Sequence, residues 1–309
     1  MNDEIQFIPD EEQIFDVLDF TPLSQSRNWG LDLCKIDDAW LKSKGAGIKV
    51  AVLDTGISDH SDLKDAWSEG HCCIDGETWE DMKSGHGTHC IGIVAARDND
   101  FGVIGVAPEC TIIPIKVLSD NGGGSFQSII KGIKKAIMLN ADIISLSLGT
   151  NQDGPKELND LIKYAVHDKG IFVIAAAGND GQGVNYPARL DDVIAVAAID
   201  ENGDIAKFTS RGSQIDMVAP GVNIYSTFLN NNYAKMSGTS QACPFISGLC
   251  ALILSYTRNN PNVPQINSIA EMMRALDLMS DDSKYIGTSD GLKWGFGCPK
   301  AVNIDWNNL

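Results

Sequence analysis

The sequence predicts an α/β fold, a three-layer αβα sandwich around a mainly parallel central sheet. Short apolar runs recur along the chain, and amphipathic helical patterns separate many of them. Nearly continuous apolar runs are typical of strands that are covered on both faces, and their alternation with helices favours βαβ units. Strands are expected at residues 48–54, 111–118, 141–148, 170–177, 193–199 and 215–220.

Helices are expected where apolar residues return every three or four positions. Residues 125–139 have three isoleucines on one helix face, and Ser125 is the expected N-cap. Residues 155–170 repeat the pattern and end in a glycine, a common residue just after a helix. Two further helices are expected to begin close to His86 and close to Ser240.

The composition is that of a globular protein with a sizeable core, since 43% of the 309 residues are hydrophobic and 21% are charged. The formal net charge of −17 argues against nucleic acid and anionic membranes as partners, because both would repel the chain. No run of 18 apolar residues is present, so no membrane span is expected.

The N-terminus, residues 1–22, is predicted to be an acidic extension that precedes one domain at 23–309. It lacks the basic head and apolar middle of a signal peptide. The eight cysteines show no C-x-x-C metal spacing. Without a secretion signal, reduced thiols and a cytoplasmic location are expected.

Several predicted strands end in polar or flexible residues. Asp54 ends the first strand, Ser147 and Gly149 end the third, and Asn179 follows the fourth. Ligands of an open parallel sheet bind beyond the carboxyl ends of its strands. We therefore expect these residues to line one rim of the molecule.

Two histidines, His86 and His89, lie three residues apart at a predicted helix start and could share a metal ion. However, the H-E-x-x-H pattern is absent and no third ligand is near in the sequence. For His89 the favoured interpretation is a hydrogen-bonded core histidine.

Four residues together supply the groups needed for nucleophilic catalysis, in the chain order Asp54, His86, Asn179 and Ser240. A serine hydroxyl needs a base to take its proton, and imidazole does this near neutral pH. A carboxylate orients the imidazole, and an amide can donate to an oxyanion. Taken alone, Ser240 could instead be only the N-cap of its helix.

Five sequence blocks occur in a fixed order: VAVLDTGIS, GHGTH, SLSLG, AAAGND and SGTSQACP. They resemble the signature blocks of the subtilisin family of serine peptidases, or subtilases, and the likeness runs from about residue 24 to 304. The resemblance implies a subtilisin-like fold and a serine endopeptidase that hydrolyses peptide bonds through an acyl-enzyme on Ser240. Asp54 would orient, His86 would act as base, and Asn179 would donate to the oxyanion.

The resemblance also implies that a peptide substrate binds as an added strand between residues 121–125 and 147–149. The expected substrate-binding residues are Gly122, Gly124, Phe126, Ser147, Leu148, Gly149, Gly178 and Asn185. The glycine run at 122–124 could also be no more than a flexible loop. The sequence leaves the preference for basic or apolar side chains open.

The loop at 96–103 resembles the main calcium loop of the family, which implies Ca²⁺ as a cofactor. The expected ligands are the side chains of Gln25, Asp62 and Asn99 and the carbonyl groups of Arg97, Phe101 and Val103. The alternative is a solvated acidic loop.

The N-terminal extension resembles that of intracellular subtilisins, with Ile8 and Pro9 in matching positions. The resemblance implies that the extension lies across the active site and inhibits the enzyme, as in a zymogen. It also suggests a homodimer. The alternative interpretation of the extension is a disordered acidic tail.

The sequence departs from the family pattern beside the expected nucleophile, and two other classes of protein are alternatives. Gln241 follows Ser240 where the family often has methionine. A pseudo-protease or structural protein within an assembly is one alternative, against which the complete catalytic set argues. A thiol enzyme that uses Cys90 or Cys243 is another, and neither cysteine has a separate base and oxyanion donor.

Overall fold

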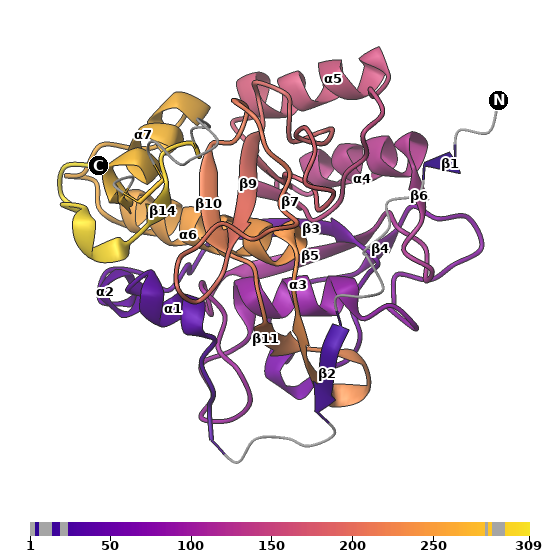
Figure 1. The fold of residues 1–309 in the computed structure, drawn as a ribbon, viewed down its shortest axis with the longest axis horizontal. Helices are drawn as coiled ribbons and strands as arrows, with labels where there is room; N and C mark the ends of the chain where they lie inside the picture. Colours follow the sequence, from indigo (N-terminus) through magenta and orange to yellow (C-terminus); the bar gives the residue numbers. More distant parts are fainter. Residues whose placement is uncertain (1–3, 6–13, 19–23, 282–283, 286–293) are drawn as a thin grey trace.

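The computed structural model describes residues 4–5, 14–18, 24–281, 284–285 and 294–309. Its centre is a seven-stranded sheet with the strand order β10-β9-β8-β7-β3-β5-β4, in which every pair of neighbours is parallel (Figure 1). The strands are β3 (Lys49–Asp54), β4 (His71–Cys72), β5 (Thr111–Lys116), β7 (Ile143–Leu146), β8 (Phe172–Ala176), β9 (Ile194–Ile199) and β10 (Met217–Pro220).

Helices cover both faces of this sheet (Figure 1). On one face lie α3 (His86–Ala95) and α6 (Thr239–Asn259), and on the other lie α4 (Phe126–Met138) and α5 (Lys156–Lys163). The remaining helices are α1 (Trp29–Leu33), α2 (Ile36–Trp40) and α7 (Ile269–Met279). The predicted αβα sandwich is thus confirmed.

The six predicted strands are all present, and each boundary agrees with the structure to within two residues. Ser125 caps α4, because its hydroxyl accepts the N–H of Ser128 at 3.1 Å. The helix predicted at 155–170 is regular only as far as Lys163, because a π-helical turn follows at Tyr164–Asp168. There the helical hydrogen bonds reach back five residues instead of four.

Short strands form smaller sheets around this centre. One sheet has the antiparallel order β11-β12-β2, and it joins β11 (Ile224–Thr227) and β12 (Tyr233–Met236) to the N-terminal β2 (Ile14–Leu18). A second joins β1 (Glu4–Ile5) to β6 (Gly124–Ser125), and a third joins β13 (Ser280–Asp281) to β14 (Cys298–Pro299). Two short segments of the N-terminal extension are therefore paired with strands of the domain.

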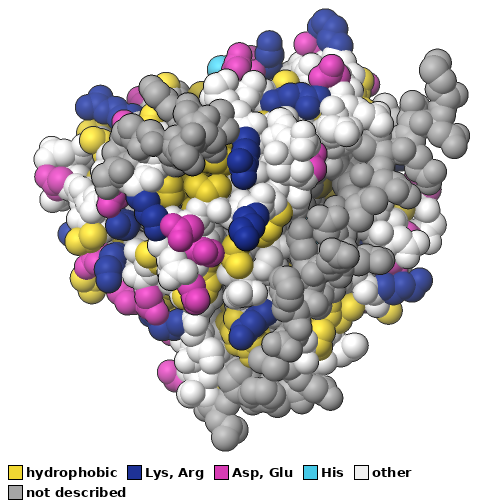
Figure 2. Space-filling model, in the orientation of Figure 1, with side chains coloured by type: hydrophobic (Ala, Val, Ile, Leu, Met, Phe, Trp, Pro, Cys, Tyr) yellow, Lys and Arg dark blue, Asp and Glu magenta, His cyan; other side chains and the backbone are white. Residues whose placement is uncertain are grey.

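The helix α6 is long and apolar enough to cross a membrane by length and composition alone. Its apolar window is, however, completely buried inside the protein, as in a core helix. On the surface, the face shown in Figure 2 carries basic and acidic side chains side by side, with hydrophobic side chains between them. On this face the two signs of charge are therefore mixed.

Asp54 lies at the topological switch point of the sheet, where the chain has placed strands on both sides of β3. The strand β3 is central, with β5 on one side and β7 on the other, and Asp54 is paired with Lys116 at the end of β5. In open α/β sheets such a switch point, at the carboxyl ends of the strands, is where ligands bind.

Candidate active site

The carboxyl end of β3 meets the first residue of α3 at this switch point. Oδ1 of Asp54 lies 2.7 Å from Nδ1 of His86, and both side chains are buried. Burial is the largest single influence and lowers the pKa of His86, but Asp54 and Cys90 together raise it more, so the pKa lies above its ordinary value. This contact fixes the imidazole with Nε2 as the nitrogen left for chemistry.

Ser240 is the second residue of α6, and Gly238 is the N-cap. The interpretation of Ser240 as a mere cap is therefore wrong. Its hydroxyl donates a hydrogen bond to the carbonyl oxygen of Ser147 at 3.2 Å. Nε2 of His86 has no hydrogen-bond partner within the described part of the chain. The hydroxyl of Ser240 must therefore turn away from Ser147 before it can donate to Nε2 of His86.

The sulfur of Cys90 links the neighbourhoods of these residues. It lies 4.0 Å from Nδ1 of His86 and 3.4 Å from the carbonyl oxygen of Ser240. His86 and the backbone of Ser240 therefore border the same buried atom. Catalytic hydrogen bonds are often long or misaligned without substrate, so this geometry is compatible with a serine–histidine pair.

A proline inside α6 frees the carbonyl group of the expected nucleophile. Pro244 has no N–H, so the carbonyl of Ser240, four residues earlier, receives no helical hydrogen bond. The hydroxyl of Ser147 donates to this carbonyl at 2.8 Å, and the Cys90 thiol approaches it as well. The end of β7 is thus tied directly to the start of α6.

The side chain of Asn179 is held by Thr239, the residue before Ser240. Oδ1 of Asn179 accepts hydrogen bonds from the N–H of Thr239 at 2.8 Å and from its hydroxyl at 2.9 Å. The same hydroxyl accepts the N–H of Gly178 at 3.1 Å. With Oδ1 engaged in this way, Nδ2 is the atom left to donate to an oxyanion.

Three of the expected substrate-binding residues pack together next to Asn179. A side chain at Gly178 would clash with the amide group of Asn185, and one at Gly149 would press on its Cβ atom. Leu148 is buried, and Phe126 packs edge-to-face on Tyr186 with 5.7 Å between ring centroids. The structure therefore brings these residues from three separate segments to one place.

The expected substrate edge at 121–125 is occupied in part by the chain itself. Gly122 closes a turn by donating its N–H to the carbonyl oxygen of Ser119 at 2.8 Å. Gly124 belongs to β6 and is paired with Ile5 of the N-terminal extension. The glycine run is thus partly a strand edge and more than a flexible loop. Ile8 and Pro9 lie outside the described residues.

The metal alternative for the two histidines does not fit the structure. Nε2 of His89 lies 3.0 Å from the carbonyl oxygen of Ile224 and 3.1 Å from that of Ala234, and burial lowers its pKa to about 3. His89 is therefore a core histidine, as expected. Among the described residues, the one His/Cys/Asp/Glu cluster compact enough for a metal ion consists of Asp54, His86 and Cys90.

The thiol alternative is disfavoured by burial. Cys90 and Cys243 are both buried, and burial raises the pKa of each thiol, that of Cys243 to about 12. A thiolate is the nucleophilic form of cysteine, so neither residue is primed to attack at neutral pH.

Four of the six residues expected to bind calcium meet at one point. The Nε2 atom of Gln25 lies 2.7 Å from the carbonyl oxygen of Arg97, 3.4 Å from that of Val103 and 3.5 Å from Oδ1 of Asn99. Oδ1 of Asp62 accepts the side-chain amide of Asn99 at 3.0 Å. The oxygen atoms of Arg97, Val103 and Asn99 therefore surround one position, which the side-chain nitrogen of Gln25 occupies.

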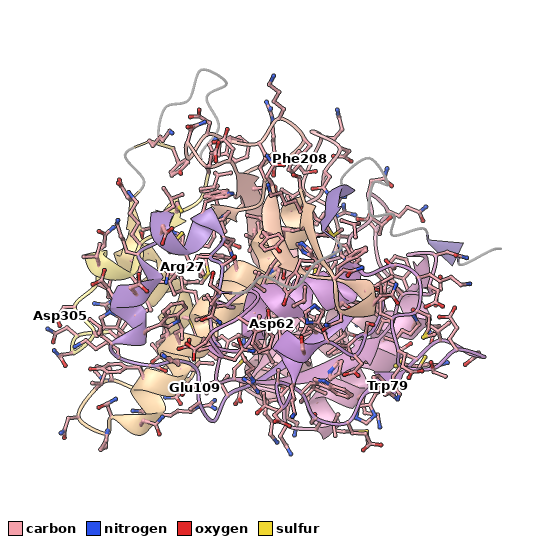
Figure 3. All side chains as sticks on the ribbon, turned by 90° about the horizontal axis from the view of Figure 1, so that it is seen from below. Arg27, Asp62, Trp79, Glu109, Phe208 and Asp305 are labelled. Carbon is pink, nitrogen blue, oxygen red and sulfur yellow. The ribbon has the colours of Figure 1, made fainter. Side chains whose placement is uncertain are left out.

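The loop closes tightly on Asp62, which lies near the middle of the face seen in Figure 3. Gly102 has a positive φ of 62°, and a side chain there would clash with the Asp62 carboxylate and the Tyr233 hydroxyl. Oδ2 of Asp62 accepts the N–H of Val103 at 2.6 Å and the Tyr233 hydroxyl at 3.0 Å. Phe101 donates its N–H to Oδ1 of Asn99 at 3.3 Å. Oxygen-rich surroundings of this kind fit a Ca²⁺ ion.

Comparison with known proteins assigns the chain to a family. The model of the subtilase family, Peptidase_S8, matches residues 45–295. The chain belongs to the subtilase family. It is accordingly a serine endopeptidase that acts on peptide or protein substrates.

Relatives of this subtilase include proteases with different names. The major intracellular serine protease of Bacillus subtilis is 43% identical over 271 residues, which cover 83% of this chain and 82% of that protein. The thermostable alkaline protease of Halalkalibacterium halodurans is 42% identical over 271 residues, covering 86% and 74%. Thermitase of Thermoactinomyces vulgaris is 39% identical over 245 residues, covering 78% and 87%.

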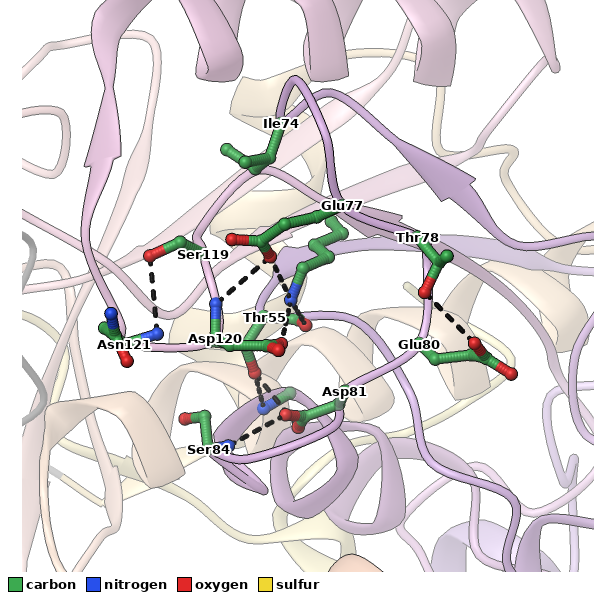
Figure 4. A network of polar contacts seen from close by, with 12 residues as sticks. Thr55, Ile74, Glu77, Thr78, Glu80, Asp81, Ser84, Ser119, Asp120 and Asn121 are labelled. Atoms are coloured by element: carbon green, nitrogen blue, oxygen red, sulfur yellow. Dashed lines mark hydrogen bonds and ion pairs between the residues drawn. The ribbon is translucent and has the colours of Figure 1, made fainter.

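Several residues around the site of this subtilase were not found from the sequence. Thr239, which holds Asn179, could have been suspected because it directly precedes Ser240. Thr55, Asp81 and Lys116 form a buried polar network behind Asp54 (Figure 4). No spacing in the sequence signals that network, because its members come from three different segments.

Proposed function

We propose that this subtilase cleaves peptide bonds with Ser240 as nucleophile, His86 as general base and Asp54 as the residue that orients the imidazole. The observation that carries the proposal is the 2.7 Å contact between Asp54 and His86, which directs Nε2 away from the carboxylate. Once its hydroxyl is turned to Nε2, Ser240 can transfer its proton there as it attacks.

The steps follow the chemistry of these groups. Oγ of Ser240 bonds to the carbonyl carbon while its proton passes to His86, and the oxyanion that forms accepts hydrogen bonds from Asn179 Nδ2 and from the N–H of Ser240. The C–N bond then breaks as His86 returns the proton to the leaving amine. Water hydrolyses the acyl-enzyme by the same route. The N–H of Ser240 lies in the first turn of α6, where N–H groups have no helical partner.

An active-site label tests this assignment. A fluorophosphonate should modify Ser240 in the full chain, as located by peptide mass spectrometry, and Ser240→Ala should be neither labelled nor active. His86→Ala should lose labelling while its circular dichroism remains that of the wild type. Labelling of a different residue, or peptide cleavage by Ser240→Ala, would overturn the assignment.

We propose that the substrate lies along Gly122, Gly124 and residues 147–149, with its first side chain above Gly178 and Asn185. The proposal is supported by the packing of Gly149 and Gly178 on Asn185 beside Asn179. Phe126, on Tyr186, would border a more distant apolar pocket. Asn185→Ala should then change the preference for that first side chain. Cleavage of a peptide library by the variant and by the wild type measures this change.

We propose that Ca²⁺ binds between Gln25, Asp62, Asn99 and the carbonyl groups of Arg97, Phe101 and Val103. The proposal is supported by three oxygen atoms around the Gln25 amide, which needs only to turn to present its own oxygen. Burial raises the pKa of Asp62, and a bound cation would favour its charged form. The ion would tie the loop at 96–103 to the N-terminal segment.

We propose that residues 1–22 inhibit the enzyme by covering its substrate edge and that the protein works in the cytoplasm. The first part is supported by the pairing of Glu4–Ile5 with Gly124–Ser125. The second is supported by the relative named as the major intracellular serine protease, although another relative is named as a minor extracellular protease. Cell fractionation followed by active-site labelling tests the location.

A further inference from the structure

A lysine is buried directly behind the proposed catalytic pair. The side chain of Lys116, at the end of β5, is 0% exposed. Its ammonium group donates to the carbonyl oxygen of Thr55 at 2.6 Å and lies 2.8 Å from Oδ1 of Asp120 and 3.2 Å from Oε2 of Glu77 (Figure 4). A charge is buried in a protein only where partners compensate it, and these three oxygen atoms do so here.

Thr55, which accepts from this lysine, is the residue after Asp54. Its N–H donates to Oδ1 of Asp54 at 2.7 Å, the same oxygen that contacts His86. Its hydroxyl donates to Oδ2 of Asp81 at 3.0 Å and accepts the N–H of Gly87 at 2.9 Å. Thr55 therefore connects the Asp54 carboxylate, the buried lysine and the first turn of α3.

Asp81 holds the other side of this connection. It is 1% exposed, and its Oδ1 accepts the N–H groups of Gly85 at 3.0 Å and Ser84 at 3.2 Å. Its Oδ2 also accepts the hydroxyl of Thr88 at 3.3 Å. The N-cap of α3 is Gly85, which has no side chain to cap the helix, so Asp81 supplies the missing acceptor and a negative charge.

We infer that Asp81 and Lys116 are positioning residues for the Asp54–His86 pair and that they act through Thr55. The inference rests on the proposed roles of Asp54 and His86. Asp81 fixes the helical turn that carries His86, and Lys116 fixes the backbone that follows Asp54. Thr55 forms hydrogen bonds with both Asp81 and Lys116. A displacement of the segment that carries either residue is therefore passed to the other segment.

The charge of Asp81 interacts with that of Asp54, the partner of His86. The titratable groups around His86 and this network are Asp54, Cys90, His89, Asp81, Lys116, Glu77 and Asp120. Removing the negative charge of Asp81 disfavours the imidazolium, so the pKa of His86 falls and the acid limb of kcat/KM moves to lower pH. A residue with a purely structural role would not move this limb.

Two nearly isosteric variants test the inference in the full chain. Thr55→Val removes the hydroxyl but no charge, and Asp81→Asn removes the charge but keeps the shape. Each should lower kcat by roughly tenfold to a hundredfold with little change in KM, because neither residue touches substrate. Of these two variants, only Asp81→Asn should shift the acid limb of kcat/KM. The double variant should lose little more than the worse single variant, because both break the same connection.

A matched control lies in the same loop. The hydroxyl of Thr78 is exposed and donates to Glu80 at 3.0 Å, without a link to Asp54 or to α3 (Figure 4). Thr78→Val should therefore keep the kcat of the wild type. Lys116→Met should lower kcat and move the acid limb to higher pH. If circular dichroism shows that Lys116→Met does not fold, the Thr55 and Asp81 variants decide whether the inference holds.

The outcomes separate this inference from the proposed function. A cleavage-competent Ser240→Ala variant would refute the proposed function itself. If Ser240→Ala is inactive but folded Thr55→Val and Asp81→Asn both stay within twofold of wild-type kcat, only the positioning role fails. A melting temperature that falls with unchanged kcat and an unmoved acid limb would likewise assign these residues to stability alone.

Discussion

Ser240 and Ser147 are joined by two hydrogen bonds that run in opposite directions. The hydroxyl of Ser240 donates to the carbonyl oxygen of Ser147 at 3.2 Å, and the hydroxyl of Ser147 donates to the carbonyl oxygen of Ser240 at 2.8 Å. The second bond satisfies the carbonyl group that Pro244 leaves without a helical donor. The proposed nucleophile is therefore anchored through its backbone, while its hydroxyl can still rotate.

Ser147→Ala should weaken this anchor. The carbonyl group of Ser240 would retain only the weak Cys90 donor, which should lower the free energy of unfolding by about 1–3 kcal/mol and also reduce kcat. Urea unfolding and peptide hydrolysis measure the two effects. Ser61→Ala, which removes an exposed hydroxyl bonded to Asn231, serves as the control. Equal stability of Ser147→Ala and the wild type would contradict the prediction.

Asn179→Ala should reduce kcat far more than it raises KM, because the amide acts on the charge that develops in the transition state. Loss of the corresponding amide in a subtilisin lowers kcat by about 10²–10³. Thr239→Val, which removes one of the two hydrogen bonds to Oδ1 of Asn179 but keeps the amide, should cause a smaller loss. Steady-state kinetics of both variants on one peptide substrate measure the difference. An unchanged kcat for Asn179→Ala would remove the amide from the mechanism.

The pH profile of kcat/KM should report the pairing of His86 with Asp54. His86 must be neutral to accept a proton, so activity should fall as the pH drops through its pKa. Because Asp54 and Cys90 together outweigh burial, this acid limb should lie above the ordinary histidine value of 6.5. Asp54→Asn should move the limb to lower pH and reduce kcat by roughly 10⁴. A limb that stays in place in this variant would argue against the pairing.

Removal of calcium should lower the melting temperature. The proposed ion holds together the loop at 96–103, Asp62 and Gln25, so a chelator should destabilise the native state but leave the unfolded state unaffected. Asp62→Asn should abolish the difference between melting curves recorded with Ca²⁺ and with chelator. Asp98→Asn, in the same loop but paired with Lys44, should retain it. Identical curves for the wild type under both conditions would count against the site.

Removal of the N-terminal extension should raise kcat/KM on a short peptide. Loss of residues 1–20 takes away both β1 and β2, whereas loss of residues 1–13 keeps the β2–β12 pairing and exposes the edge at Gly124. Both trimmed forms should therefore gain activity, and a synthetic peptide of residues 1–13 should inhibit them. Equal rates for the full and trimmed chains would refute inhibition by the extension.

The fold was largely predictable because β3, β5, β7, β8 and β9 are buried strands with nearly continuous apolar sequences. The short strands β4, β11 and β12 escaped prediction, since two to four residues with polar members carry no recognisable period. The catalytic candidates were found because each lies in a specific sequence block. Lys116 was not, because its burial depends on Glu77 and Asp120, which only the folded chain brings to it.

Under the proposed inhibition, the pairing of Glu4–Ile5 with the edge of Gly124–Ser125 has a kinetic consequence. A blocking strand that is tethered to its own target is present at a fixed local concentration, which dilution of the protein does not change. Substrate must therefore compete with a neighbour that never diffuses away. Cutting the tether turns that neighbour into a free peptide, and its hold on the edge then weakens with every further dilution.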